Sequence, residues 1–376
     1  MSRSRWLILG SHIPPSGHLG GMVRYVLEMG KALAARSDVD VHVHCRSTSM
    51  ATLSDAVGIG PERLHASRGS GAVADGLREL VGLGSLLKAV QPNVVFGSKH
   101  LVPLLPTTMD IYRVLTVHDM LPFDRPGDFA VAKRLLLPPM YRSSLRRADL
   151  LACVSEATRQ RLVDRFPEVE PQATVVSNAM TPSLARVDPQ PLSGVDCGKF
   201  VLVVGDRSPR KNVRFVAELW ADVVERRPNA RLVLVGPPGW GTDEEVSGIA
   251  DLVASGSVIE AGHVSEGQLR WAYENAAATL CPSRLEGFGL PVVEALGFGC
   301  PVIHSTDPAQ IEAANGAGTA IGLDDRRSWI EASITHLDGT DRHGPNTVPR
   351  RTWDDAADEL VGAVAEMSGR STRSPR

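Results

Sequence analysis

Short runs of apolar residues recur along the whole chain, and stretches with helical spacing separate them. Strand-like apolar runs occur at 6–9, 39–45, 93–96, 113–119, 149–156, 174–178, 200–205, 231–235, 258–263 and 278–281. Between them, residues 22–35 place Val23, Val26 and Leu33 on one side of a helix. Strands that alternate with helices predict an α/β chain with parallel sheets.

The pattern divides the chain into two α/β halves. The 376 residues are enough for about two or three domains. Residues 181–198 contain three prolines and show no periodicity, as expected of a linker. We therefore predict an N-terminal domain over 1–182, a linker over 183–198, a second domain over 199–350, a terminal helix over 351–368 and a disordered tail over 369–376.

Composition and charge exclude several classes of protein. The net charge of −3 gives no reason to expect nucleic-acid binding. Neither a signal peptide nor a membrane span is expected, because the apolar runs are too short. The five cysteines are scattered and never form a C-x-x-C pair, which favours reduced thiols in the cytoplasm. His42 and His44 share a strand face but lack a third ligand nearby, so no metal site is predicted.

One glycine-rich segment has the pattern of a ligand site. Glu286 precedes the loop Gly287, Phe288, Gly289 and Leu290, and Glu294 follows in the first turn of the next helix. The order strand, loop, helix, strand places the loop at the carboxyl edge of a parallel sheet, where such sheets bind ligands. Backbone N–H groups there favour a phosphate, and a carboxylate accepts hydrogen bonds from hydroxyls, a combination that suits a nucleotide sugar. The alternative is that the glutamate complements the helix dipole and the glycines serve packing.

A second loop has an unusual density of positive charge. It follows the strand ending at Gly205 and carries Arg207, Arg210 and Lys211 before a helix predicted over 213–226. Because the N-terminus of a helix is already positive, cations there are unfavourable unless an anion is bound. This loop, with Gly205 at its start as a further donor-binding candidate, is therefore a candidate phosphate site.

Both loops resemble elements of one enzyme family. The sequence from Glu286 to Glu294, with its later Gly-x-Pro-Val, resembles the E-x7-E element of family-4 retaining glycosyltransferases, which have the GT-B fold. The resemblance implies that Glu294 binds the donor ribose and that Glu286 faces the transferred sugar, with the amides of 287–290 near sugar and diphosphate. The 209–212 segment resembles the family's Pro-Arg-Lys-Asn variant, in which the lysine and an arginine hold the diphosphate. Many relatives carry that arginine directly after the glycine, where this chain has Asp206, so we prefer Arg210 over Arg207.

The same resemblance covers most of the chain and assigns further residues. His118 follows a strand, where a structural role is the usual one, but it matches the family histidine that lies over the sugar ring. Gly20 and Gly21 match the first loop and helix, which approach the donor diphosphate. Val264 lies in the loop that borders the base in relatives, and the terminal helix matches a segment that returns to the N-terminal domain.

The sequence therefore predicts a GT-B enzyme with two Rossmann-like domains facing across a cleft. The expected reaction moves a hexose or deoxyhexose from a GDP-, UDP- or dTDP-linked donor to an acceptor hydroxyl, with retention and without a metal or other cofactor. A nucleotide-sugar epimerase and an inactive nucleotide-binding subunit are the alternative functions.

A predicted helix over 130–147, broken at Pro138-Pro139, carries a set of cations. We favour a solvated helix face, and peripheral contact with an anionic membrane is the alternative. These cations are Lys133, Arg134, Arg142, Arg146 and Arg147.

Overall fold

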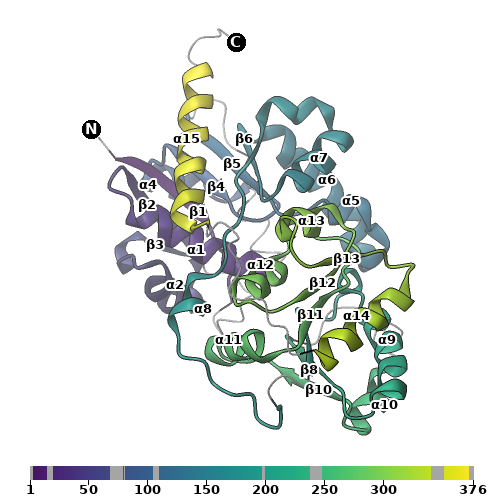
Figure 1. The fold of residues 1–376 in the computed structure, drawn as a ribbon. Helices are drawn as coiled ribbons and strands as arrows, with labels where there is room; N and C mark the ends of the chain where they lie inside the picture. The colour runs from purple at the N-terminus through teal and green to yellow at the C-terminus, as the bar shows by residue number, and fades with distance from the viewer. Residues whose placement is uncertain are drawn as a thin grey trace. The chain divides into compact units, whose positions relative to one another are not determined.

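The computed structural model describes residues 3–14, 20–67, 79, 81–104, 110–196, 200–237, 248–339 and 351–371. The chain forms two compact units, one of Met1–Asn178 with Arg351–Arg376 and one of Ala179–Arg350. Each unit contains one parallel sheet with helices packed on it (Figure 1). The predicted class, two parallel-sheet α/β domains, is confirmed.

The sheet of unit 1 has seven strands in the order β3-β2-β1-β4-β5-β6-β7. The strands are β1 Ser4–Leu9, β2 Val39–Arg46, β3 Leu64–Ser67, β4 Val94–Gly97, β5 Tyr112–Val117, β6 Leu150–Cys153 and β7 Ala173–Val175. The α-helices are α1 Gly21–Ala35, α2 Met50–Val57, α4 Gly84–Val90, α5 Leu121–Asp124, α6 Val131–Arg147, α7 Glu156–Arg165 and α15 Trp353–Ser371. Short 3₁₀ turns occupy Ser47–Ser49, Pro61–Arg63, Pro126–Asp128 and Pro167–Gln172.

The sheet of unit 2 has six strands in the order β10-β9-β8-β11-β12-β13. They are β8 Phe200–Val204, β9 Arg231–Val235, β10 Val258–Gly262, β11 Ala278–Cys281, β12 Val302–Ser305 and β13 Thr319–Ile321. The helices are α8 Pro182–Arg186, α9 Val213–Arg226, α10 Ile249–Ala254, α11 Glu266–Asn275, α12 Leu290–Gly297, α13 Pro308–Ala314 and α14 Arg326–Asp338. A 3₁₀ turn, η5, spans Pro209–Lys211.

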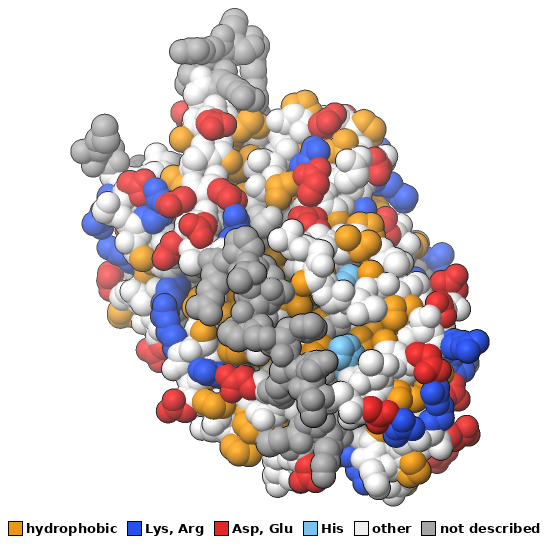
Figure 2. Space-filling view, in the orientation of Figure 1, with side chains coloured by type: hydrophobic (Ala, Val, Ile, Leu, Met, Phe, Trp, Pro, Cys, Tyr) orange, Lys and Arg blue, Asp and Glu red, His pale blue; other side chains and the backbone are white. Residues whose placement is uncertain are grey.

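The core of unit 2 lies on both faces of its sheet. Along β8, Leu202 belongs to one buried cluster, whereas Val201 and Val203 belong to another. Successive side chains of a strand point to opposite faces, so helices must cover both of them. This explains why the strands read as continuous apolar runs. On the face of the molecule shown in Figure 2, acidic and basic side chains are interspersed.

The terminal helix α15 packs against α1 within unit 1 (Figure 1). Its first residue, Trp353, meets Tyr25 edge to face with ring centroids 5.6 Å apart. Just before the helix, Arg351 Nε donates a hydrogen bond of 2.9 Å to the carbonyl of Ser177. The end of the chain is thereby attached to the unit that contains its beginning.

Three local expectations differ from the structure. The helix expected to break at Pro138-Pro139 runs through both prolines as α6. Each proline removes one backbone donor; residues 131–136 are exposed, so water can reach the carbonyls that lose their partners. The expected linker contains the short helix α8, and α15 continues to Ser371, past the expected end at 368. Residues 372–376 of the expected tail lie outside the described part.

Candidate active site

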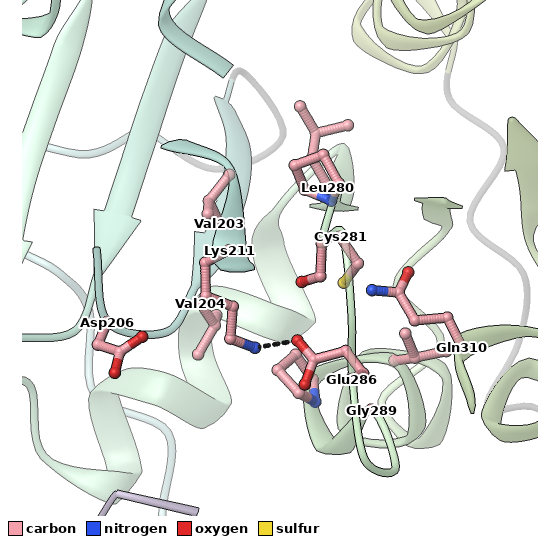
Figure 3. Close-up of a pocket in the computed structure, with 13 residues that line it drawn as sticks. Val203, Val204, Asp206, Lys211, Leu280, Cys281, Glu286, Gly289 and Gln310 are labelled. Carbon is pink, nitrogen blue, oxygen red and sulfur yellow. Dashed lines mark ion pairs between the residues drawn. The ribbon is translucent and has the colours of Figure 1, made fainter. Parts of the chain in front are cut away.

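The candidate site of unit 2 lies where the strand order of its sheet changes direction. From β8 the chain proceeds to β9 on one side, whereas β11 pairs with β8 on the other side. Ligands of open α/β sheets bind at the carboxyl ends of strands that flank such a switch point. The loops after β8 and β11 carry Lys211 and Glu286, and both side chains line one pocket (Figure 3).

Glu286 is held by two cations. Its Oε2 lies 2.7 Å from Arg210 Nη1, and its Oε1 lies 2.6 Å from Lys211 Nζ. Burial by itself raises the pKa of Glu286, but the charges of Arg210 and Lys211 outweigh it and lower the pKa to about 2. The residue is only 7% exposed, so its side chain is a shielded carboxylate whose charge is compensated within the site. Figure 3 shows Lys211 reaching across the pocket to this carboxylate.

Backbone contacts hold the two loops together. Arg284 N donates to the carbonyl of Arg210 at 2.7 Å, and Asn212 Nδ2 donates to the carbonyl of Pro282 at 3.3 Å. Asn212 adopts the left-handed conformation, with φ of 59°, and ends the η5 turn directly before α9. Asparagine tolerates that conformation better than most residues. The turn therefore fixes where the two preceding cations point.

Two glycines allow this arrangement. Gly205 has φ of 142°, and a Cβ there would stand 3.0 Å from Lys211 Cε, so its missing side chain leaves room for the folded lysine. Gly289 has φ of 102°, and its Cβ would lie 3.3 Å from Ala313 Cβ. Other residues strongly disfavour these backbone conformations. Gly205 thus has a packing role against Lys211 in addition to the donor contact expected of it.

Arg207 takes a different direction from the other two cations. Its Nη2 pairs with Glu260 Oε1 of β10 at 2.5 Å. The structure therefore brings Arg210 and Lys211 together with Glu286, and it pairs Arg207 with an acid of β10. Val264 follows β10 and packs against the buried core, next to Ser265, which caps α11.

Glu294 lies on α12, with only 2% of its surface exposed, and outside the lining of the pocket at Glu286. Thr181 Oγ1 donates to its Oε1 at 2.9 Å, and the Tyr273 hydroxyl donates to its Oε2 at 3.0 Å. Both donors are fully buried, so the carboxylate is fixed in one orientation. Sequence reasoning missed Thr181 and Tyr273. They lie 113 and 21 residues from their partner, and no spacing rule connects them to it.

The glycine-rich loop itself stands at the start of α12. Gly287, Phe288 and Leu290 are partly exposed, whereas Gly289 is buried. Ser305 of β12 anchors the segment that leads into the loop, because its Oγ donates a hydrogen bond of 2.7 Å to the carbonyl of Ser283.

The remaining expected residues belong to unit 1. His118 follows β5, is 7% exposed, and hydrogen-bonds the Ser98 carbonyl through Nε2 at 2.9 Å. Burial lowers its pKa, against the opposing effect of that carbonyl, so the ring is neutral with the proton on Nε2.

Gly20 precedes α1 in an extended conformation, with nothing within 4 Å of a Cβ at that position, and the exposed Gly21 begins the helix. Packing therefore does not require a glycine at position 20.

The described residues contain no group of three or more histidine, cysteine or acidic side chains able to hold a metal ion. Within the same residues, no helix is long and apolar enough to cross a membrane.

Comparison with known proteins identifies both units. Residues 19–184 match the glycosyltransferase family 4 model, and residues 191–332 match the glycosyl transferases group 1 model. The chain is 25% identical over 285 residues to the O-antigen chain mannosyltransferase RfbU of Salmonella typhimurium, covering 74% of this chain and 77% of the relative. It is 27% identical to the D-inositol 3-phosphate glycosyltransferase of Kineococcus radiotolerans, over 86% and 84% of the two chains.

A solved structure shares the architecture. Anabaena HepE in complex with UDP and glucose superposes with a TM-score of 0.62 at 16% identity, over 99% of both chains. Two parallel sheets of this kind, matched by family models in both halves, are the GT-B arrangement. The chain is therefore a glycosyltransferase, built from a family 4 domain and a group 1 domain on the GT-B fold.

Proposed function

We propose that the chain is a retaining glycosyltransferase that moves a hexose or deoxyhexose from a nucleoside-diphosphate sugar to an acceptor hydroxyl. The observation that carries this proposal is the ion-pair cluster of Glu286 with Arg210 and Lys211 at the switch point of unit 2. The mannosyltransferase relative supports a hexose donor, and the UDP complex of the structural neighbour supports a nucleoside diphosphate.

The chemistry follows from where charge develops. Breaking the bond between sugar and diphosphate leaves negative charge on the leaving group, and preorganised cations at that point lower the barrier. Arginine grips two oxygens at once, whereas lysine acts as a mobile point charge. Before the donor binds, Glu286 is ion-paired with both cations. A bound diphosphate would compete with Glu286 for them and release that carboxylate towards the transferred sugar.

The other residues have supporting roles in this proposal. Glu294, oriented by Thr181 and Tyr273, accepts hydrogen bonds from the ribose hydroxyls. The amides at the start of α12 face the diphosphate, as N–H groups of a helix start favour anions. The roles of Gly20, Gly21 and His118 of unit 1, as donor-contacting residues, rest in this proposal on the family resemblance. No metal takes part.

The test is incubation of the purified protein with GDP-, UDP- and dTDP-linked hexoses, followed by NMR of the products. Transfer or slow hydrolysis of one donor with retained anomeric configuration is expected. An epimerised sugar would show instead that the chain is a nucleotide-sugar epimerase. Tight nucleotide binding with no turnover of any donor would favour an inactive partner subunit.

We also propose that α6 contacts an anionic membrane surface, because its first half exposes both apolar and basic side chains. Val131, Leu135 and Leu136 are 72%, 67% and 62% exposed. Lys133 and Arg134 lie among them and are also exposed. Arg146 is engaged by Glu168 at 2.7 Å, so the first half of the helix supplies the contact. Exposed apolar residues beside cations suit the interface of an anionic bilayer.

A further inference from the structure

Polar side chains also converge at the carboxyl edge of the unit 1 sheet. β4 pairs with β1 and with β5 in aligned register, Leu9 opposite Gly97 and Gly97 opposite Leu115. The chain segments that leave these strands therefore start side by side. They carry His12 after β1 and Lys99 and His100 after β4. The strand order changes direction between β1 and β4, so this edge is the switch point of unit 1.

Three groups at this edge lack partners. His12 Nε2 and His100 Nδ1 are shielded from solvent without a hydrogen bond to any described residue. Burial lowers the pKa of His12 to about 3, and it also lowers that of Lys99. Lys99 makes no ion pair or hydrogen bond within the described part of the chain, although it is partly buried. Buried polar groups in folded proteins are nearly always paired, so such a cluster indicates a binding partner that the described residues do not supply.

The charge around these groups is positive. Lys99 is close enough to Arg46 and Lys133 for their charges to lower its pKa further, and Glu79 is the acid that acts against them. Glu79 is already engaged: its Oε1 accepts from Ser11 N at 3.1 Å and lies 3.5 Å from His44 Nδ1. Its role is to hold the segment after β1. The field therefore favours an anion over a neutral sugar hydroxyl.

We infer that this edge of unit 1 binds a phosphate group of the acceptor, with Lys99 as the cation and His12 and His100 as hydrogen-bond donors. Donors arriving from two strand ends suit an oxyanion with several acceptor oxygens. The inference rests on the proposed glycosyl transfer for the identity of the second substrate. The donor diphosphate is the less favoured source of the anion, because unit 2 holds Arg210 and Lys211 for it.

The test is an NMR titration in which inorganic phosphate is added to the protein, with its histidines isotope-labelled. The ring signals of His12 and His100, assigned by His12→Gln and His100→Gln, should shift together. Lys99→Met should raise the apparent Kd at least tenfold, Lys99→Arg should largely restore it, and Lys211→Met should leave it within twofold. Unchanged affinity in Lys99→Met would overturn the inference, as would loss of the shifts in Lys211→Met, which would assign the anion to the donor site.

Thermal stability separates a binding lysine from a structural one. A partly buried cation without a partner costs free energy, so Lys99→Met should melt at the same or a higher temperature when no ligand is present. A marked fall in the melting temperature would show that the lysine supports the fold and would contradict the inference. Because phosphate binding needs no donor turnover, failure here differs from failure of the proposed reaction.

Discussion

Lys211 Nζ lies 2.6 Å from Glu286 Oε1, so the lysine expected to hold a diphosphate is paired with the carboxylate expected to face the sugar. Arg210 holds the other oxygen of the same carboxylate. The cluster has two positive charges and one negative charge, and its cations are fixed before any donor is present. Preorganisation of this kind removes the reorganisation cost at the moment of reaction.

The low pKa of Glu286 makes the stability of unit 2 depend on pH. Its folded-state pKa is about 2, against 4.5 for the free side chain. A depressed pKa contributes stability above pH 4.5, and that stability is lost as the pH falls towards 2. The shift corresponds to on the order of 3 kcal/mol. Urea unfolding of the wild type and of Glu286→Gln at pH 6 and pH 3 measures it: the wild type should lose more stability than the variant. Equal losses would show that the ion pairs do not form in solution.

The Glu294 carboxylate depends on its two buried donors. Glu294→Gln should weaken nucleoside diphosphate binding by about 1–3 kcal/mol, because a charged acceptor for the ribose is lost. Tyr273→Phe removes only the hydrogen bond to Oε2 and should cost about 0.5–1.5 kcal/mol of the same binding. Calorimetric titration with GDP and UDP measures both.

Tyr112→Phe is a matched control for the tyrosine variant. Its hydroxyl also donates a hydrogen bond, at 3.3 Å to the Asp149 carbonyl, but it lies in unit 1. We expect it to leave nucleotide affinity unchanged. If Tyr273→Phe also bound nucleotide as tightly as the wild type, the positioning role would be refuted; an unaffected Glu294→Gln would refute the ribose assignment.

Gly289 should tolerate no side chain. Its φ of 102° and the 3.3 Å approach of a Cβ to Ala313 together strain any substitution. Gly289→Ala should lower the free energy of unfolding by about 1–3 kcal/mol. Gly127→Ala is the control, because nothing lies within 4 Å of its Cβ position and its φ is not left-handed. Chemical denaturation of both variants is the measurement, and equal effects would mean that the loop adopts another conformation.

Membrane contact by α6 requires both its apolar and its charged side chains. Replacing Leu135 and Leu136 by serine should reduce flotation with phosphatidylglycerol vesicles at any salt concentration. Lys133→Gln should weaken binding by about 1 kcal/mol, and only at low salt. Arg226→Gln, on α9 of unit 2, is the control. Equal binding to neutral and anionic vesicles would contradict a role for the cations.

Most of the fold was predictable because its elements are local. Buried parallel strands read as continuous apolar runs, and Ser155 caps α7 by accepting from Thr158 N at 3.0 Å, a local role that serine commonly has at a helix start. The helix over 213–226 has the predicted bounds. The continuous α6 was missed because a pair of prolines normally ends a helix, and the exposure that permits it is a property of the fold.

The site was predictable as a pair of loops, whereas the contacts within it were not. All three cations, which lie within five residues, suit a phosphate. The sequence does not show that the η5 turn directs Arg210 to an ion pair with Glu286, whereas Arg207 pairs with Glu260. That choice depends on the hydrogen bond between Arg284 N and the Arg210 carbonyl, 74 residues apart in the chain. The hydrogen-bond donors to Glu294 could not be predicted either, because they too are distant from it in the sequence.

The most direct test of the account is the initial rate of donor turnover, with and without EDTA, for wild type, Arg210→Ala and Lys211→Ala. If these cations neutralise the leaving diphosphate, the wild-type rate is unaffected by EDTA, and each variant loses roughly 2–4 kcal/mol, about 30- to 1,000-fold in rate. A wild-type rate abolished by EDTA and restored by magnesium or manganese would contradict the account, and so would near-normal turnover in both alanine variants.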